Sequence, residues 1–166
     1  MDKPRSRRIR LIRLTLVILI VLAAAAWALA SRAAPPLPFR FLHDLQLADR
    51  PFSSAEVHGK RQCEYVYTGQ TKYADVFRQA KAELTADGWK EDKTDEFARD
   101  GAKFIKAQSS GTISDTWVLL KRDAKVQMGS AGRLVTNKAA GWTSVRCLLN
   151  GKAPGFWDRL QAALRM

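Results

Sequence analysis

The chain has 166 residues, the size of one ordinary domain, and its hydrophobic content of 46% argues against wholesale disorder. The net charge of +12 resembles that of a nucleic-acid-binding protein, but half of it lies in residues 1–33, which hold seven basic side chains and one acidic one. The rest of the chain is only moderately basic, so composition does not by itself indicate a nucleic-acid partner.

An uninterrupted apolar segment occupies residues 14–30 and contains neither charge nor proline. Its 17 residues would span roughly 26 Å as a helix, against roughly 30 Å for a hydrocarbon core. A soluble core helix would carry a polar face, and this segment has none. We predict a basic cytoplasmic region at residues 1–13 and a transmembrane signal-anchor at residues 14–31, with the C-terminal part outside the cytoplasm because positive flanks stay inside.

A cleaved signal peptide is the alternative to a retained anchor. Ala28, Leu29 and Ala30 form the small-x-small pattern that a signal peptidase accepts, and cleavage there would release a periplasmic or secreted domain. The apolar run is longer than the roughly 7–15 residues of a typical signal peptide, which favours the anchor. Arg7 and Arg8 also overlap part of a twin-arginine export signal. A retained anchor predicts a protein of the bacterial envelope.

Residues 32–60 are predicted to form a linker and a poorly defined segment. Pro35, Pro36 and Pro38 favour an extended spacer, because proline fixes φ and biases the residue before it toward extended backbone. A further proline and a glycine interrupt any long element after it.

The domain proper is predicted at residues 61–166. It begins with a strand at 62–68 and a helix at 72–87, whose apolar residues recur at helical spacing. These are Tyr73, Val76, Phe77, Ala80 and Leu84. Thr71 is the predicted N-cap and Gly88 the C-cap glycine.

Short strands are expected at residues 89–92, 102–108, 116–122 and 143–149, with a hairpin pairing 125–128 and 133–136. A C-terminal helix from about residue 154 carries an apolar stripe of Phe156, Trp157, Leu160 and Leu164. Short connections favour antiparallel neighbours. The predicted fold class is therefore α+β: a single N-terminal membrane-spanning helix followed by one small domain with a mostly antiparallel sheet and two packed helices.

Cys63 and Cys147 each fall in a predicted strand. In an oxidising compartment they would form a disulfide, worth about 4 kcal/mol in the loop-entropy model. The alternative is two reduced, buried thiols that act as small apolar side chains. The sequence has no Cys-x-x-Cys motif, so a redox-active pair is not expected.

The sequence carries no constellation that supports a catalytic, cofactor-binding or metal site. Its two histidines, His43 and His58, do not pair with another ligand at metal-binding spacing. Neither a Gly-x-Ser-x-Gly nor a Ser-x-x-Lys motif is present in the domain. The glycine-containing segment at 129–133 is predicted to be a hairpin turn, since it lacks the spacing of a nucleotide-binding loop.

Basic side chains alternate with apolar ones along two predicted strands and reach the hairpin. We expect them to contact anionic lipid headgroups or an acidic envelope polymer rather than nucleic acid. They are Lys103, Lys106, Lys121, Arg122, Lys125 and Arg133. The C-terminal helix is expected to pack on the sheet, with a bilayer surface as the alternative.

The sequence thus predicts a membrane-anchored extracytoplasmic interaction domain, or an accessory subunit of a membrane or envelope complex with a membrane-protein partner, and no catalytic activity. One alternative is an enzyme of unrecognised type acting on an envelope polymer, which would need convergent carboxylates. The candidates for these are Glu64, Glu91, Asp92, Asp95, Glu96 and Asp115. The other is a lipid- or small-ligand-binding module with an apolar cavity.

Overall fold

The computed structural model describes residues 4–32, 35–48, 52–57, 60–106, 116–129 and 133–164. Contacts divide the chain into two compact units. The anchor unit comprises Met1–Pro36 and Pro154–Met166, and the sheet domain comprises Leu37–Ala153. The sheet domain thus begins well before residue 61, where the sequence placed its start.

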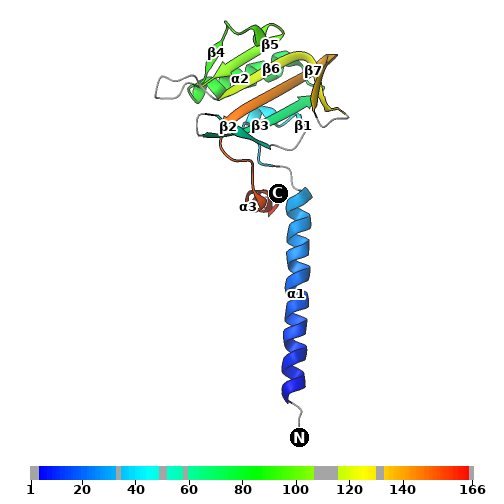
Figure 1. Ribbon diagram of the computed structural model, residues 1–166. Helices are drawn as coiled ribbons and strands as arrows, with labels where there is room; N and C mark the ends of the chain where they lie inside the picture. Colours follow the sequence, from blue (N-terminus) through cyan, green and yellow to red (C-terminus); the bar gives the residue numbers. More distant parts are fainter. Residues whose placement is uncertain are drawn as a thin grey trace. The chain divides into compact units, whose positions relative to one another are not determined.

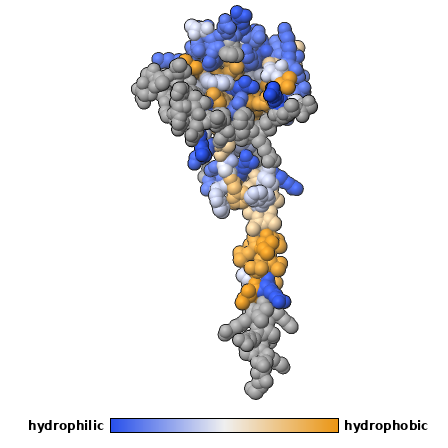
Figure 2. All heavy atoms as spheres, viewed as in Figure 1, coloured by the Kyte–Doolittle hydropathy of each residue, from blue (hydrophilic) through white to orange (hydrophobic). Residues whose placement is uncertain are grey.

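The anchor unit is built on helix α1, Pro4–Arg32. Its Ile12–Arg32 portion has 21 residues, a mean hydropathy of 2.5 and almost no buried surface, so it is long and apolar enough to span a membrane. Figure 2 shows the apolar surface of this helix, whereas the visible surface of the sheet domain is mainly hydrophilic. Membrane anchors and signal sequences share these properties.

Helix α3, Phe156–Leu164, belongs to the anchor unit, and none of its residues is fully buried. The rings of Phe156 and Trp27 of α1 stack with their centroids 5.7 Å apart. The sequence predicted that this helix packs on the sheet, and the contact that the structure shows within the anchor unit is the one with α1.

Within the described residues, seven strands form one antiparallel sheet in the order β1-β3-β7-β6-β5-β4, and β2 also pairs with β3 (Figure 1). The strands are β1 (Gln46–Leu47), β2 (Phe52–Val57), β3 (Lys60–Gly69), β4 (Lys90–Asp92), β5 (Gly101–Ile105), β6 (Trp117–Met128) and β7 (Leu134–Asn150). The predicted α+β class with a mostly antiparallel sheet is confirmed.

Helix α2, Tyr73–Ala86, packs against one face of this sheet (Figure 1). The predicted apolar stripe supplies its buried residues, Val76, Ala80 and Leu84. Gly88 follows the helix at φ +82°, as a C-cap glycine should. The N-cap is Lys72 rather than Thr71, because the Thr71 hydroxyl donates to the carbonyl of Asp44 at 3.4 Å.

The segment that the sequence left undefined completes the core. A short 3-10 helix, η1 (Arg40–Leu42), buries Phe41 and Leu42 in the same cluster as α2. The Glu83 carboxylate accepts hydrogen bonds from the backbone N–H groups of Arg40 and Phe41, at 3.0 and 3.1 Å. One charged side chain of α2 therefore holds this segment in place.

Strands β6 and β7 form one long hairpin, in which residues 125–128 pair with 134–137, one residue beyond the predicted 133–136. A register shift interrupts the hairpin where Asp123 adopts φ +49° and Gly141 adopts φ +77°. The Gly141 N–H donates to the Asp123 carboxylate at 2.9 Å. Beyond this bulge the end of the hairpin turns across the sheet face opposite α2, where the Val126 N–H reaches the Thr68 hydroxyl at 3.5 Å.

Candidate functional site

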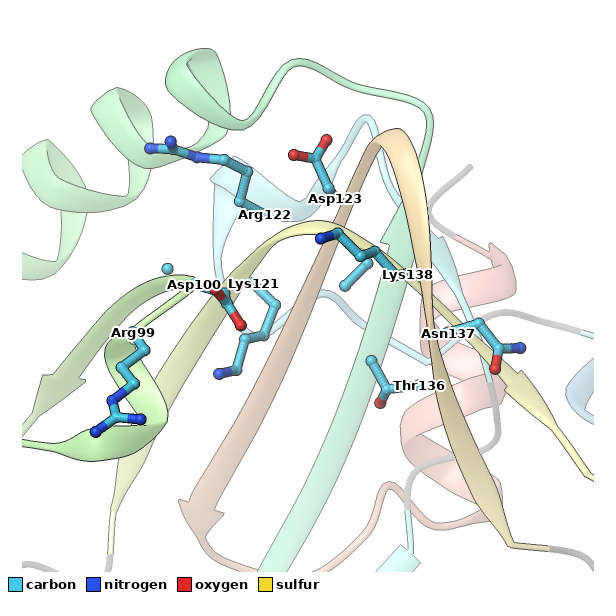
Figure 3. Close-up of a pocket in the computed structure, with 10 residues that line it drawn as sticks. Arg99, Asp100, Lys121, Arg122, Asp123, Thr136, Asn137 and Lys138 are labelled. Atoms are coloured by element: carbon cyan, nitrogen blue, oxygen red, sulfur yellow. The ribbon is translucent and has the colours of Figure 1, made fainter.

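A pocket of about 460 Å³ lies where the bulge of the β6–β7 hairpin meets the start of β5 (Figure 3). We call it the basic pocket. It is lined by Arg99, Asp100, Gly101, Lys121, Arg122, Asp123, Ala124, Thr136, Asn137 and Lys138.

The backbone of β5 approaches β6 closely at the edge of the basic pocket. A Cβ atom on Gly101 would overlap the carbonyl oxygen of Leu120, so only glycine fits this position. The Arg122 N–H donates to the Asp100 carbonyl at 2.7 Å, which joins the turn before β5 to the bulge of β6. The pocket is therefore bordered by backbone that hydrogen bonds hold in place.

Four basic side chains and two carboxylates line the basic pocket, so its formal charge is positive. The Arg122 guanidinium lies over the Tyr73 ring, 4.8 Å from its centroid, and the Asp123 carboxylate accepts the Gly141 N–H. In the described part of the chain, Arg99, Arg122 and Lys138 form no ion pair with a carboxylate. Their charges are available to an anionic ligand.

Strand β6 borders the basic pocket, and Figure 3 shows how the charged side chains of the pocket are arranged. Lys121 and Arg122 extend to opposite sides of β6, with Arg122 directed toward α2. The Lys138 side chain, from the neighbouring strand β7, reaches back toward Asp123 and the middle of the pocket. Such a set can hold a phosphate or carboxylate group by charge and hydrogen bonding.

The structure brings together only two of the six basic residues that the sequence singled out, Lys121 and Arg122. Lys103 pairs with Asp95. Lys125 lies over the Trp142 ring, 4.4 Å from its centroid, and Arg133 is exposed on the hairpin.

Lys106, another of the six, forms an ion pair with an aspartate. Its amino group pairs with Asp87 at 3.0 Å. The hydrogen bonds that Lys106 and the Trp89 ring donate hold the pKa of Asp87 below its ordinary value.

Sequence reasoning missed Arg99 and Lys138. Arg99 follows the short 3-10 helix η2, Glu96–Ala98, and Lys138 pairs with Ala124 across the hairpin. Neither residue lies in a basic run, so no local pattern signals a shared site. The hairpin register is the feature that brings Lys138 near Lys121.

Among the residues that the structure describes, the carboxylates considered for an enzyme do not converge. Three of them form separate ion pairs: Glu64 with Arg146 at 2.9 Å, Glu91 with Lys81 at 3.4 Å, and Asp95 with Lys103. The Asp92 carboxylate accepts from the backbone and hydroxyl of Thr94, Glu96 is exposed in η2, and Asp115 lies outside the described residues.

The described residues that could bind a metal ion do not cluster either. His43 pairs with the adjacent Asp44 at 2.8 Å, and His58 lies outside the described residues. No group of three or more histidine, cysteine or acidic side chains suited to a metal ion occurs among the residues that the structure describes.

Cys63 and Cys147 are free thiols buried beneath α2 on neighbouring strands. Their register is diagonal, because Cys63 faces Leu149 and Cys147 faces Tyr65. Diagonal neighbours are separated by about 7–8 Å, which does not favour a disulfide without backbone movement. Burial raises the pKa of both thiols above the ordinary value, so the arrangement matches the alternative of two apolar thiols.

Two smaller hollows open on the sheet face opposite α2. They measure about 190 and 180 Å³ and share Leu119 and Arg146 in their walls. Both are smaller than the roughly 300–1,000 Å³ of typical ligand pockets, so neither supports a lipid cavity.

No protein-family model, no curated protein and no solved structure matches this chain. The chemistry of the basic pocket and the properties of α1 are therefore the observations from which a function is argued.

Proposed function

We propose that this protein is a membrane-anchored extracytoplasmic interaction domain that binds an anionic group of an envelope partner in the basic pocket. The observation that carries the proposal is a pocket where Arg99, Arg122 and Lys138 are left without carboxylate partners among the described residues. In this role the protein acts as an accessory, non-enzymatic component of a bacterial envelope complex.

The proposed topology places the N-terminus in the cytoplasm and the sheet domain outside. Six basic residues precede residue 14, and positive flanks favour the cytoplasmic side. Only one helix in the described part of the chain has the length and composition of a span. A retained α1 makes the protein single-pass, whereas cleavage after Ala30 would leave the same domain free in the periplasm.

Binding is the chemistry that the pocket supports best. Its cationic groups can neutralise phosphate or carboxylate, and the Asp123 carboxylate already accepts the backbone N–H of Gly141. Interactions of this kind contribute about 1 kcal/mol per basic side chain near an anionic surface and weaken as salt screens them.

The first test measures anion binding by the full chain in nanodiscs of zwitterionic lipid. Inorganic polyphosphate and polyglutamate serve as the phosphate and carboxylate probes. The double variant Lys121→Gln/Lys138→Gln should weaken binding of the preferred probe about 10–30-fold, since two contacts of about 1 kcal/mol are removed.

The matched control is Lys90→Gln/Lys93→Gln, which removes the same charge from exposed positions outside the pocket. It should change affinity less than about 3-fold at physiological salt, where exposed charges are screened. An equal loss in both double variants would show that binding follows net charge, and the pocket would lose its assigned role.

The partner itself can be sought by crosslinking in intact cells, followed by detergent extraction, purification through a C-terminal tag and mass spectrometry. We expect a reproducible partner that the Lys121→Gln/Lys138→Gln variant loses and the control variant keeps. Recovery of the wild-type protein alone would contradict the accessory-subunit role.

A further inference from the structure

We infer that helix α3 lies in the interface of the bilayer, beside the extracytoplasmic end of α1, with Trp157 and Leu164 inserted among the lipids. This inference rests on the proposed insertion of α1 but not on the basic pocket. It makes the C-terminal segment a second membrane contact.

The start of α3 is well defined by its own residues. The Gly155 N–H donates to the Asp158 carboxylate at 2.8 Å, and the Arg159 N–H donates to the Gly155 carbonyl at 3.2 Å. An acidic side chain in the first turn satisfies a backbone donor that would otherwise lack a partner. The helix therefore begins without depending on the sheet domain.

The apolar stripe of α3 has two edges. Residues seven apart lie on nearly the same line of a helix, so Phe156 and Ala163 form one edge, and Trp157 and Leu164 form the other. The Phe156 edge contacts α1, where Phe156 stacks on Trp27. The other edge is uncovered, because Trp157 is 70% exposed and Leu164 is 73% exposed.

The contact with α1 sets the depth of α3. Trp27 lies five residues before the end of α1 at Arg32, which corresponds to about 7.5 Å along the helix axis. Interfacial helices lie about 5–10 Å into the boundary between headgroups and acyl chains, and tryptophan is enriched at that level. A helix held against Trp27 is therefore at the depth where its exposed aromatic edge meets lipid.

Lipid is favoured as the occupant because the uncovered edge continues an existing lipid-facing surface. Leu29 of α1 is 53% exposed and Trp27 is 68% exposed, within the segment that has the properties of a span. Asp158 is exposed on α3 at a position away from the stripe, where it would meet water.

The test uses the full chain reconstituted in phosphatidylcholine vesicles whose acyl chains carry bromine either near the headgroup or near the methyl end. Bromine quenches tryptophan at short range. The chain has five tryptophans, so emission from one is obtained by subtracting the signal of its phenylalanine variant. The variants are Trp157→Phe, Trp27→Phe as the span reporter, and Trp89→Phe, which removes a tryptophan buried in the sheet domain.

We expect the Trp157 component to be quenched more strongly by shallow than by deep bromine, as the Trp27 component is, and the Trp89 component to be quenched by neither. Introducing Leu164→Trp into the Trp157→Phe background should restore the lost shallow quenching. If the Trp27 component is quenched while the components at positions 157 and 164 respond only to iodide in water, the inference is overturned and the anchor stands. If no component is quenched, α1 is not in the membrane, and both proposals fail.

Discussion

Tyr67 offers a test of the packing of the core, because its hydroxyl is buried without a hydrogen-bond partner among the described residues. The side chain is 1% exposed on the face of β3 that packs beneath α2, and its hydroxyl has no hydrogen-bond partner among the described residues. On folding this group loses its hydrogen bonds to water and gains none, a cost of about 1–3 kcal/mol. Tyr67→Phe keeps the ring and leaves no large cavity, so it should raise the free energy of unfolding by about 1–2 kcal/mol.

The same substitution should change how the free energy of unfolding depends on pH above pH 10. Burial raises the pKa of the Tyr67 hydroxyl above its ordinary value of 10.0. Below pH 10 the hydroxyl is protonated in both states, but above it the unfolded chain ionises and the folded chain does not. The wild-type free energy of unfolding should therefore fall by an additional amount of about 1.4 kcal/mol per pH unit above pH 10, and the variant should lack this contribution.

Urea unfolding of the full chain in detergent micelles, followed by circular dichroism between pH 7 and 11, measures both effects. Tyr65→Phe is the matched control, since Tyr65 lies two residues away on the same face and its hydroxyl interacts with the Cys63 thiol. Removing a satisfied hydroxyl should cost about 0.5–1.5 kcal/mol. If Tyr67→Phe destabilises the fold as much as Tyr65→Phe, the Tyr67 hydroxyl has a partner and the reasoning is refuted.

Three further experiments test the approach of β5 to β6, the thiols and the N-terminal part of the sheet domain. Gly101→Ala would place a Cβ atom on the Leu120 carbonyl and should cost about 3 kcal/mol in urea unfolding, whereas Gly88→Ala has open space at φ +82° and should cost about 1 kcal/mol. An equal cost for the two alanine variants would contradict the close approach of β5 to β6. Maleimide should label neither Cys63 nor Cys147 in the folded chain and both after unfolding without reductant, because they are free and buried; labels that appear only after reduction would reveal a disulfide. Glu83→Ala removes the acceptor of two backbone N–H groups and should destabilise the fold by about 1–3 kcal/mol, with faster hydrogen exchange at Arg40 and Phe41. Unchanged exchange at these amides would show that η1 does not depend on Glu83.

Local pattern determined a large part of this fold. The apolar run in α1 and the helical spacing of α2 are properties of adjacent residues, and each predicted its element correctly. Alternation in β3 likewise predicted the face that carries Cys63 and Tyr67 into the core. Short connections were enough to predict antiparallel pairing, because a parallel strand needs a long crossover.

Contacts between distant residues decided the rest. Phe41 lies in the core, and Glu83, 42 residues later, accepts a hydrogen bond from its backbone; no local pattern marks that contact. Phe156 contacts Trp27 of α1, although an amphipathic helix pattern suits a sheet face equally well. The basic pocket depends on the hairpin register that brings Lys138 near Lys121, and register is set by the bulge at Asp123 and by packing across the sheet. Periodicity encodes which face of an element is apolar, but the partner of that face is chosen by packing in three dimensions.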